Sequence, residues 1–174
     1  MQCTRLSAVL PLCALIVACK RPEPIRLQPT IEEPAKLVSV VRMVDPSSSG
    51  QLLRGFYPPE SSSWRWAAKK FSVVLGAPAA ASKDGAVLVL MFNLPDASVH
   101  ALKKIAVQAN IGNVEVSPEE YSTRGQHEYR REVPASAFPK DPVEVDFTLD
   151  KVLSLPNDNR ELGLVVTQIG LAPK

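Results

Sequence analysis

The stretch Val143-Glu144-Val145-Asp146-Phe147-Thr148-Leu149 decides the fold, because apolar and polar residues alternate along all of it. Successive side chains of a β-strand point to opposite faces, so this alternation predicts a strand with one face in a core and the other in solvent. The four apolar residues are expected to point inward, and Glu144, Asp146 and Thr148 are expected to point outward.

Similar short runs recur along the chain, separated by turns rich in proline, glycine, asparagine and aspartate. Residues 162–171 are apolar on both faces, which is typical of a strand in the middle of a sheet. Residues 117–121 read Ser-Pro-Glu-Glu-Tyr, a cap followed by proline and acidic residues, and this order predicts one helical turn. Strands are predicted over residues 37–44, 71–75, 86–92, 104–110, 114–116, 127–133, 143–149 and 162–171.

This pattern of about eight short strands, without a long amphipathic helix, is typical of an all-β domain. The chain also lacks a strand–helix–strand unit of roughly 30 residues, which a doubly wound sheet would require. We therefore expect a single antiparallel β-sandwich, of jelly-roll or immunoglobulin-like type, over residues 37–174. Internal repeats are not visible.

The N-terminus has the features of an export leader. Arg5 supplies a positive charge, and residues 6–18 are uncharged and mostly apolar. These 13 residues are too few to cross the membrane as a helix, which needs roughly 20 residues. Cleavage by the ordinary secretory peptidase, with Cys19 incidental, is one interpretation, but no small-x-small site follows within reach.

The run Ile16-Val17-Ala18-Cys19 resembles the lipobox of bacterial lipoproteins. The resemblance implies that residues 1–18 are a signal peptide, that Cys19 carries a diacylglyceryl thioether, and that its new amino group is usually acylated. Several acyl chains give stable anchoring, whereas one chain binds only marginally. Lys20 after the cysteine, in place of an aspartate, is similar to the default outer-membrane sorting pattern. The expected location is therefore the cell envelope, with a lipid anchor in the outer membrane.

Residues 19–36 are expected to link Cys19 to the domain. Residues 20–36 hold four prolines among charged side chains, and proline fixes the backbone near polyproline II. A semi-rigid stalk is the predicted result. At ~3.1 Å per residue, it can lift the domain up to roughly 50 Å from the membrane.

Charge and cysteine content exclude several classes of function. The formal charge of +2 becomes +1 without the leader, whose one charged side chain is Arg5. Nucleic acid is not an expected partner, because no basic stripe with interleaved aromatic residues is present. Cys3 and Cys13 leave with the leader and Cys19 is lipidated, so the domain has no thiol for a disulfide, a metal or a nucleophile. No cofactor is expected.

Residues 54–66 read Arg-Gly-Phe-Tyr-Pro-Pro-Glu-Ser-Ser-Ser-Trp-Arg-Trp and include both tryptophans of the chain. Flat aromatic rings beside hydrogen-bonding side chains are typical of sugar-binding sites, because the C–H face of a pyranose stacks on an indole. The candidate ligand-binding residues are Tyr57, Glu60, Trp64, Arg65 and Trp66.

Two interpretations of this stretch stay open. Trp64 and Trp66 are two residues apart, so on a strand they share a face. If that face points inward, the tryptophans fill the core, and Glu60 pairs with Arg65 or Arg54 in a loop. If the face points outward, the two indoles form an aromatic platform.

Residues 54–66, followed by Phe71-Ser72-Val73-Val74-Leu75, also resemble β-sandwich modules of uncharacterised bacterial envelope proteins. Some of these modules are similar to galactose-binding-like domains. The resemblance covers about residues 37–171, implies a binding module and assigns no binding residue.

The sequence contains no convincing catalytic or metal-binding motif. His100 and His127 lack metal-like neighbours, the serines lack a G-x-S-x-G elbow, and no carboxylate pair stands out among the 18 acidic residues. Asn157-Asp158-Asn159 offers oxygen ligands for calcium but lacks the spacing and glycine of a calcium loop, so a plain Asx turn is expected. We expect neither a metal site nor enzymatic activity.

The sequence therefore predicts a membrane-anchored, non-catalytic envelope lipoprotein whose β-sandwich binds a ligand, either polysaccharide or a partner protein. The alternative is an assembly lipoprotein that docks on a larger envelope complex through an exposed sheet edge or face. An exposed tryptophan pair would favour the first function, and an apolar patch of outward residues on the last strand would favour the second.

Overall fold

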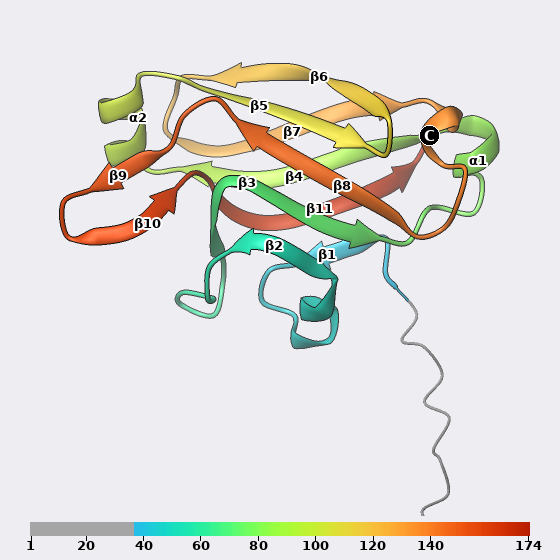
Figure 1. The fold of residues 1–174 in the computed structure, drawn as a ribbon, viewed down its shortest axis with the longest axis horizontal. Helices are drawn as coiled ribbons and strands as arrows, with labels where there is room; N and C mark the ends of the chain where they lie inside the picture. Colours follow the sequence, from blue (N-terminus) through green and yellow to red (C-terminus); the bar gives the residue numbers. More distant parts are fainter. Residues whose placement is uncertain (1–36) are drawn as a thin grey trace, which may run out of the picture. The chain divides into compact units, whose positions relative to one another are not determined.

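The chain forms a β-structure of eleven strands and four short helical segments within the described residues (Figure 1). The computed structural model describes residues 37–174, so the predictions for the signal peptide, Cys19 and the linker lie outside the described residues. All described residues belong to one compact unit. None of the helices in this unit has both the length and the apolar composition that crossing a membrane requires. The strands are β1 (Val40–Arg42), β2 (Leu52–Phe56), β3 (Arg65–Leu75), β4 (Ala86–Leu94), β5 (Ile105–Ile111), β6 (Val114–Tyr121), β7 (Gly125–Val133), β8 (Val143–Leu149), β9 (Leu153–Leu155), β10 (Asp158–Leu162) and β11 (Val165–Pro173), and the helical segments are η1 (Pro46–Gln51), α1 (Ala81–Asp84), α2 (Asp96–Leu102) and η2 (Ala135–Ala137).

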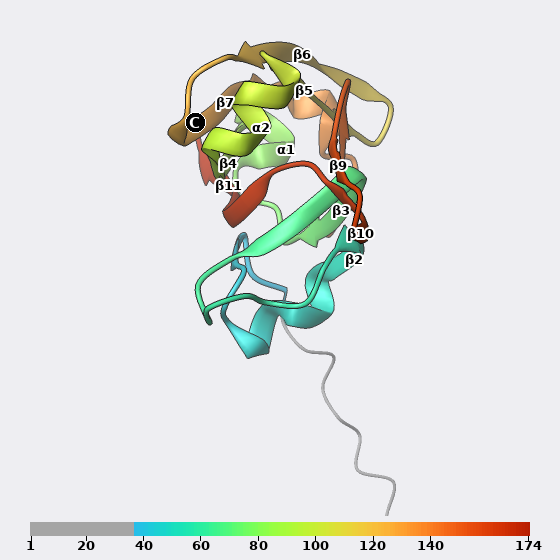
Figure 2. The same ribbon diagram turned by 90° about the vertical axis from the view of Figure 1, so that its left-hand side faces the viewer.

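The strands form one large antiparallel sheet that folds back on itself as a barrel-like sandwich. Its main strand order is β6-β5-β8-β3-β11-β4-β7, with β1 paired to β11 and β2 paired to β3. A separate hairpin, β9–β10, lies beside α2 at the end of the sandwich that faces the viewer in Figure 2. The prediction of an antiparallel all-β fold is therefore confirmed.

Strand β3 joins the two layers of the sandwich. Its first residues, Arg65 and Trp66, pair with β11, whereas its second half, from Lys70 to Leu75, pairs with β8. One continuous strand thus belongs to one layer at its start and to the other layer at its end. This change of partner is what turns the sheet through a corner.

The opposite corner, between β6 and β7, is closed by side chains. The Tyr121 hydroxyl donates to the Glu128 carbonyl oxygen at 3.1 Å, and the Tyr129 hydroxyl donates to the Ser117 carbonyl oxygen at 2.7 Å. Arg131 Nε also donates to the Ser117 carbonyl oxygen, at 3.1 Å. These bonds satisfy carbonyl groups at strand edges that have no ladder partner in the sheet.

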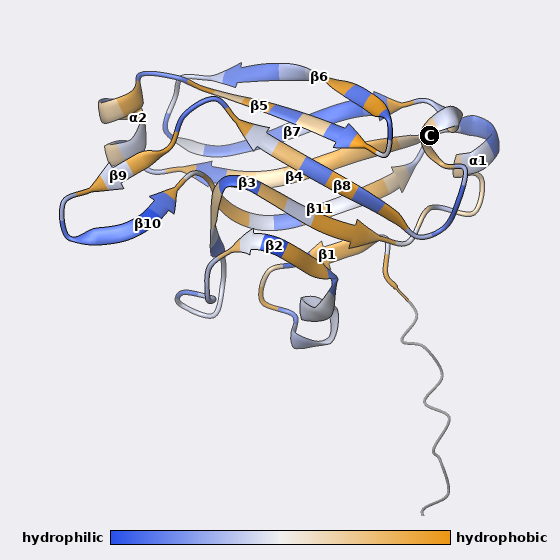
Figure 3. Cartoon of the chain, in the orientation of Figure 1, coloured by the Kyte–Doolittle hydropathy of each residue, from blue (hydrophilic) through white to orange (hydrophobic). Residues whose placement is uncertain are grey.

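The core lies between the two layers and is aromatic at its centre. Phe71 of β3 and Phe147 of β8 are cross-strand partners whose rings stack at 4.9 Å, and the Tyr129 ring meets Phe147 edge to face. Along β8 hydrophobic and hydrophilic residues alternate (Figure 3), and the four apolar residues are buried as predicted. Burial of each phenylalanine contributes about 1.5–3 kcal/mol to stability.

The predicted helical turn at residues 117–121 is wrong, because these residues belong to β6. Pro118 is tolerated in this strand for two reasons. The strand lies at an edge of the sheet, and the β5–β6 register shifts between the Ala109–Val116 and Val107–Glu119 pairs. That shift leaves Ser117 and Pro118 in a bulge, where a proline removes no ladder hydrogen bond.

Candidate functional site

Four residues that face each other across four strands form one row on the outer surface. Trp66 of β3 is the cross-strand partner of Val165 in β11, Val165 is the partner of Asn93 in β4, and Asn93 is the partner of Gln126 in β7. Cross-strand partners project from the same face of a sheet. The antiparallel register therefore brings an indole, a valine and two amides together from distant parts of the chain.

The tryptophans project outward, not into the core. Ala67, the neighbour of Trp66, is fully buried, and alternation along β3 places Trp66 on the opposite face. Both indoles are half-buried, and they meet edge to face, with ring centroids 6.1 Å apart and planes at 85°. Of the two interpretations that the sequence left open, the inward one is wrong.

A tight loop holds Trp64 against Trp66. The Tyr57 N–H donates to the Trp66 carbonyl oxygen at 3.0 Å, and the Glu60 N–H donates to the Trp64 carbonyl oxygen at 2.9 Å. Within the loop that the Glu60–Trp64 bond closes, the chain reverses at Ser61 and Ser62, whose φ angles are positive. The loop is thereby fixed at both ends, and it orients the Trp64 ring.

The two indoles and the amide row border an open hollow of about 430 Å³, which we call the tryptophan hollow. Val165, only 7% exposed, forms its floor between Trp66 and Asn93. The remaining lining residues are Ser63, Pro95 and Thr167.

The polar groups of the tryptophan hollow retain hydrogen-bonding capacity. Among the hydrogen bonds of residues 37–174, none involves the side-chain amide of Asn93 or of Gln126. The Thr167 hydroxyl donates to the Met91 carbonyl oxygen at 3.1 Å, which leaves its oxygen free to accept. The lining includes no charged side chain. Such a site can stack an apolar face and hydrogen-bond uncharged groups.

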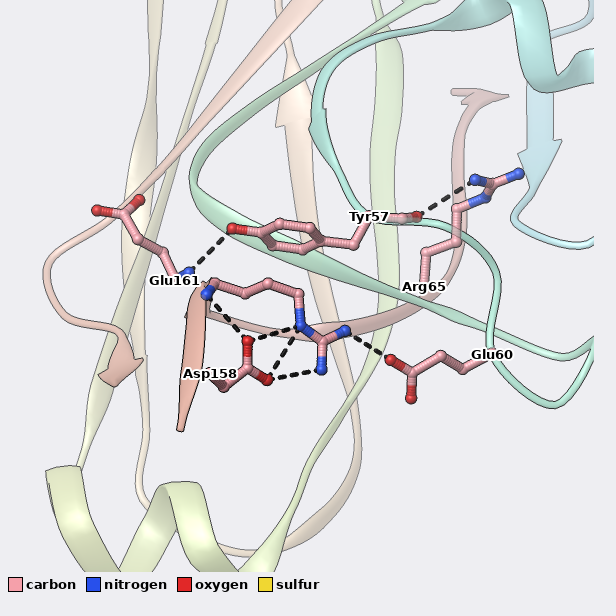
Figure 4. Close-up of polar contacts among 6 residues, drawn as sticks. Tyr57, Glu60, Arg65, Asp158 and Glu161 are labelled. Atoms are coloured by element: carbon pink, nitrogen blue, oxygen red, sulfur yellow. Dashed lines mark hydrogen bonds and ion pairs between the residues drawn. The ribbon is translucent and has the colours of Figure 1, made fainter. Parts of the chain in front are cut away.

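The other three predicted site residues, Tyr57, Glu60 and Arg65, have structural partners (Figure 4). The Glu161 N–H donates to the Tyr57 hydroxyl at 2.9 Å. Arg65 Nε donates to the Met43 carbonyl oxygen at 3.0 Å and thereby ties β3 to the end of β1. These contacts hold the loop in place and do not present the side chains to the hollow.

Arg160 is the partner of Glu60, which corrects the expected pairing with Arg65 or Arg54. Its guanidinium lies 2.7 Å from Glu60 and also donates to both carboxylate oxygens of Asp158. These hydrogen bonds from Arg160 hold the pKa of Asp158 below its ordinary value, and the two carboxylates raise the pKa of Arg160. Arg54 instead pairs with Asp146 and Glu144 on β8.

The remaining sequence candidates have ordinary surroundings. His127 Nε2 lies 2.7 Å from the Thr123 carbonyl oxygen, and its ring packs near Phe92 and Tyr121. His100 is exposed in the last turn of α2. Asp158 Oδ1 accepts from the Arg160 N–H, as in an Asx turn, at the start of β10. Residues 37–174 contain no cluster of three His, Cys, Asp or Glu side chains that could hold a metal ion.

Other hollows lie at the opposite end of the sandwich, around the loop after β3. Their lining is mostly small residues and proline, together with Asp141. The Asp141 carboxylate already accepts from the Ala77 N–H at 2.9 Å, so it holds the loop. The tryptophan hollow is therefore the better candidate, since it combines aromatic rings with side-chain amides that have no hydrogen-bond partner in the described part of the chain.

Comparison of the sequence with protein-family models and with curated proteins finds no match to either. The site therefore has to be interpreted from its own chemistry. Sequence reasoning found the two tryptophans but missed Asn93, Gln126 and Thr167. One signal was available: Asn93 is the only polar residue among the outward positions of β4, where Val87, Val89 and Met91 precede it.

Proposed function

We propose that this protein is a lipid-anchored, non-catalytic protein of the bacterial cell envelope that binds glycan through the tryptophan hollow. The observation that carries the proposal is the outward pair of indoles beside two side-chain amides that make no hydrogen bond within residues 37–174. An indole stacks on the C–H face of a sugar, and amide groups donate to and accept from its hydroxyls.

The position of the hollow in the domain supports this function. Trp66 lies at the start of β3, whereas the Gly76 N–H, just after the end of β3, donates to the Val38 carbonyl oxygen. The described chain thus begins at one end of β3, and the hollow lies at the other. A domain tethered through Cys19 and the linker would hold its binding site away from the tether.

Affinity electrophoresis tests the proposal. A soluble fragment of residues 37–174 is run through gels cast with a panel of polysaccharides, beside Trp64→Ala and Leu155→Ala variants. We expect retardation of the wild-type fragment on at least one gel and its loss in Trp64→Ala, because the stacking surface is removed. Leu155→Ala removes an exposed apolar side chain outside the hollow and should be retarded like the wild type.

Circular dichroism of the Trp64→Ala fragment provides the folding control. Mobility that is unchanged on every gel would contradict glycan binding. Retardation that persists in a folded Trp64→Ala fragment would show that the glycan binds outside the tryptophan hollow.

A second candidate function, docking on another envelope protein, is supported by exposed valines. Val38, Val40 and Val44 are each about 42% exposed and lie on or beside β1. A photo-crosslinker at position 40 in intact cells tests this function. Crosslinking to a single protein, lost when Val38 is replaced by lysine, would support docking. The absence of any specific crosslinked product would contradict docking through these valines.

A further inference from the structure

We infer that the tryptophan hollow accepts one uncharged sugar unit at a time, as the end or a side branch of a glycan, and not a stretch of extended polymer. This inference rests on the proposed glycan binding and specifies its ligand.

The angle between the indoles limits the ligand to one stacked ring. Successive units of an extended chain can stack only on aromatic rings that lie roughly in one plane. Trp64 and Trp66 stand at 85°, with centroids 6.1 Å apart. A sugar stacked on one indole therefore meets the other indole at its edge, and this second ring forms a wall that stops the chain from continuing in that direction.

The other sides of the hollow are also bounded. Asn93 and Gln126 lie across from Trp66 in the same row, and Pro95 follows β4 directly. A volume of about 430 Å³ is at the lower end of the range for small-molecule sites, which is roughly 300–1,000 Å³. The space suits one ring and part of a second.

The absence of charge around the lining favours a neutral sugar. A carboxylate, phosphate or ammonium group placed there would lose water without gaining a counter-charge. Asp96, which follows Pro95, and Arg124, two residues before Gln126, are of opposite sign and lie 3.7 Å apart in an exposed pair. The Arg65 guanidinium, between the two tryptophans in sequence, donates to the Met43 and Tyr57 carbonyl oxygens, and none of these three charged residues lines the hollow.

The side-chain amides of Asn93 and Gln126 supply the hydrogen-bonding groups for the sugar hydroxyls. Asn93 and Gln126 each carry a carbonyl acceptor and an NH₂ donor, and as direct cross-strand partners they lie side by side. Two neighbouring amides match two neighbouring hydroxyls, each of which donates and accepts.

Tryptophan fluorescence of the full-length protein tests the inference, because both tryptophans of the chain lie in the hollow. The protein is kept in a detergent without a sugar headgroup. The probes are methyl glycosides of glucose, galactose, mannose and N-acetylglucosamine, the matching linear di-, tetra- and hexasaccharides, and glucuronic acid. We expect one neutral series to bind, with a Kd that changes less than threefold from the methyl glycoside to the hexasaccharide, and glucuronic acid to bind at least tenfold more weakly.

An Asn93→Asp variant gives a second, independent readout. It keeps the shape of the amide but places a negative charge in the hollow, so we expect at least a tenfold loss of affinity for the neutral sugar. Leu155→Ala should leave the affinity unchanged.

Two outcomes would overturn the inference while leaving glycan binding intact. One is a hexasaccharide that binds tenfold or more tightly than its methyl glycoside, which would indicate several subsites in line. The other is preferred binding of glucuronic acid. If no saccharide binds at any length, the proposed function fails and the inference falls with it.

Discussion

Arg160 shows how one side chain can hold two segments together. It binds Asp158 within its own hairpin and Glu60 in the loop that leads to the tryptophans, and its guanidinium lies over the Tyr57 ring. The neighbouring Glu161 N–H is also engaged, by the Tyr57 hydroxyl. The β9–β10 hairpin is thereby the support on which the loop before Trp64 rests.

Acid should weaken this support. The pKa of Asp158 is lowered in the folded protein from its ordinary value of 3.8, chiefly by hydrogen bonds from Arg160. A lowered pKa means that the ionised carboxylate stabilises the fold above about pH 4 and that this contribution is lost as the pH falls through the folded-state pKa. We expect Asp158→Asn to unfold at a lower temperature than wild type at pH 7, with the difference shrinking below about pH 4.

Differential scanning calorimetry from pH 7 to pH 3 measures this difference. Asp84→Asn is the matched control, since among residues 37–174 the exposed Asp84 carboxylate makes no hydrogen bond. An Asp158→Asn difference that stays constant over the whole pH range would show that the Arg160 contacts do not act through charge.

At the residue scale, the sequence could identify the aromatic cluster but not its partners. Local composition singles out Trp64 and Trp66, and their spacing predicts that they share a face. Which face that is depends on the pairing of Trp66 with Val165, nearly a hundred residues later in the chain. The position of Asn93 in the site could not be predicted from its neighbours in sequence either, because the β4–β11 register places it beside Val165.

At the scale of elements, strands with a clean alternation or a long apolar run were predicted, and strands without either were missed. β8 and β5 carry one apolar face each, and their inward residues are buried. β3 begins at Arg65, well before the predicted start at residue 71. β2, β9 and β10 show only weak alternation of apolar and polar residues. They are strands because they pair with neighbouring strands, β2 with β3 and β9 with β10, and the local sequence does not reveal this pairing.

The error at residues 117–121 has a specific physical cause. Serine, proline and acidic residues in this order fit a helix start and also fit a bulge at a sheet edge. The Tyr129 hydroxyl and Arg131 Nε, both from β7, donate to the Ser117 carbonyl oxygen and select the bulge. Tertiary contacts therefore decided between two structures that the local sequence permits equally.

The β6–β7 corner yields a prediction for alkaline pH. Burial raises the pKa of Tyr129 to about 12 in the folded protein, while an unfolded chain ionises near pH 10. A raised folded-state pKa contributes stability below about pH 10, and this contribution is lost as the pH rises toward 12. Tyr129→Phe removes it together with the hydrogen bond to Ser117, so we expect a loss of about 1 kcal/mol at pH 8.

Urea unfolding followed by circular dichroism at pH 8, 10 and 11 measures the effect. The midpoints of wild type and Tyr129→Phe should converge as the pH rises, because only the wild-type residue ionises on unfolding. A gap that stays equal or widens from pH 8 to pH 11 would contradict the assigned role of the buried hydroxyl.

At the scale of the whole molecule, the proposed lipid anchor requires Cys19 of the lipobox-like run. We expect Cys19→Ala to abolish incorporation of an alkyne-tagged fatty acid in cells and to remove the protein from the membrane fraction. Cys13→Ala is the matched control, because it changes a leader cysteine six residues away and should still be labelled. Labelling that persists in Cys19→Ala would rule out the anchor at this position.

The antiparallel pairing of β1 and β11 also determines how the domain bears mechanical load. A pull between Leu37 and the tryptophan hollow runs along the strands, because the two points lie at opposite ends of β3. Hydrogen bonds of an antiparallel pair stand perpendicular to the strands. Such a pull therefore shears the β1–β11 bonds, from Leu171 N–H to Ser39 and from Met43 N–H to Thr167, at the same time. Bonds that must break together resist tension far better than bonds opened one by one, which suits a domain pulled from its N-terminal end.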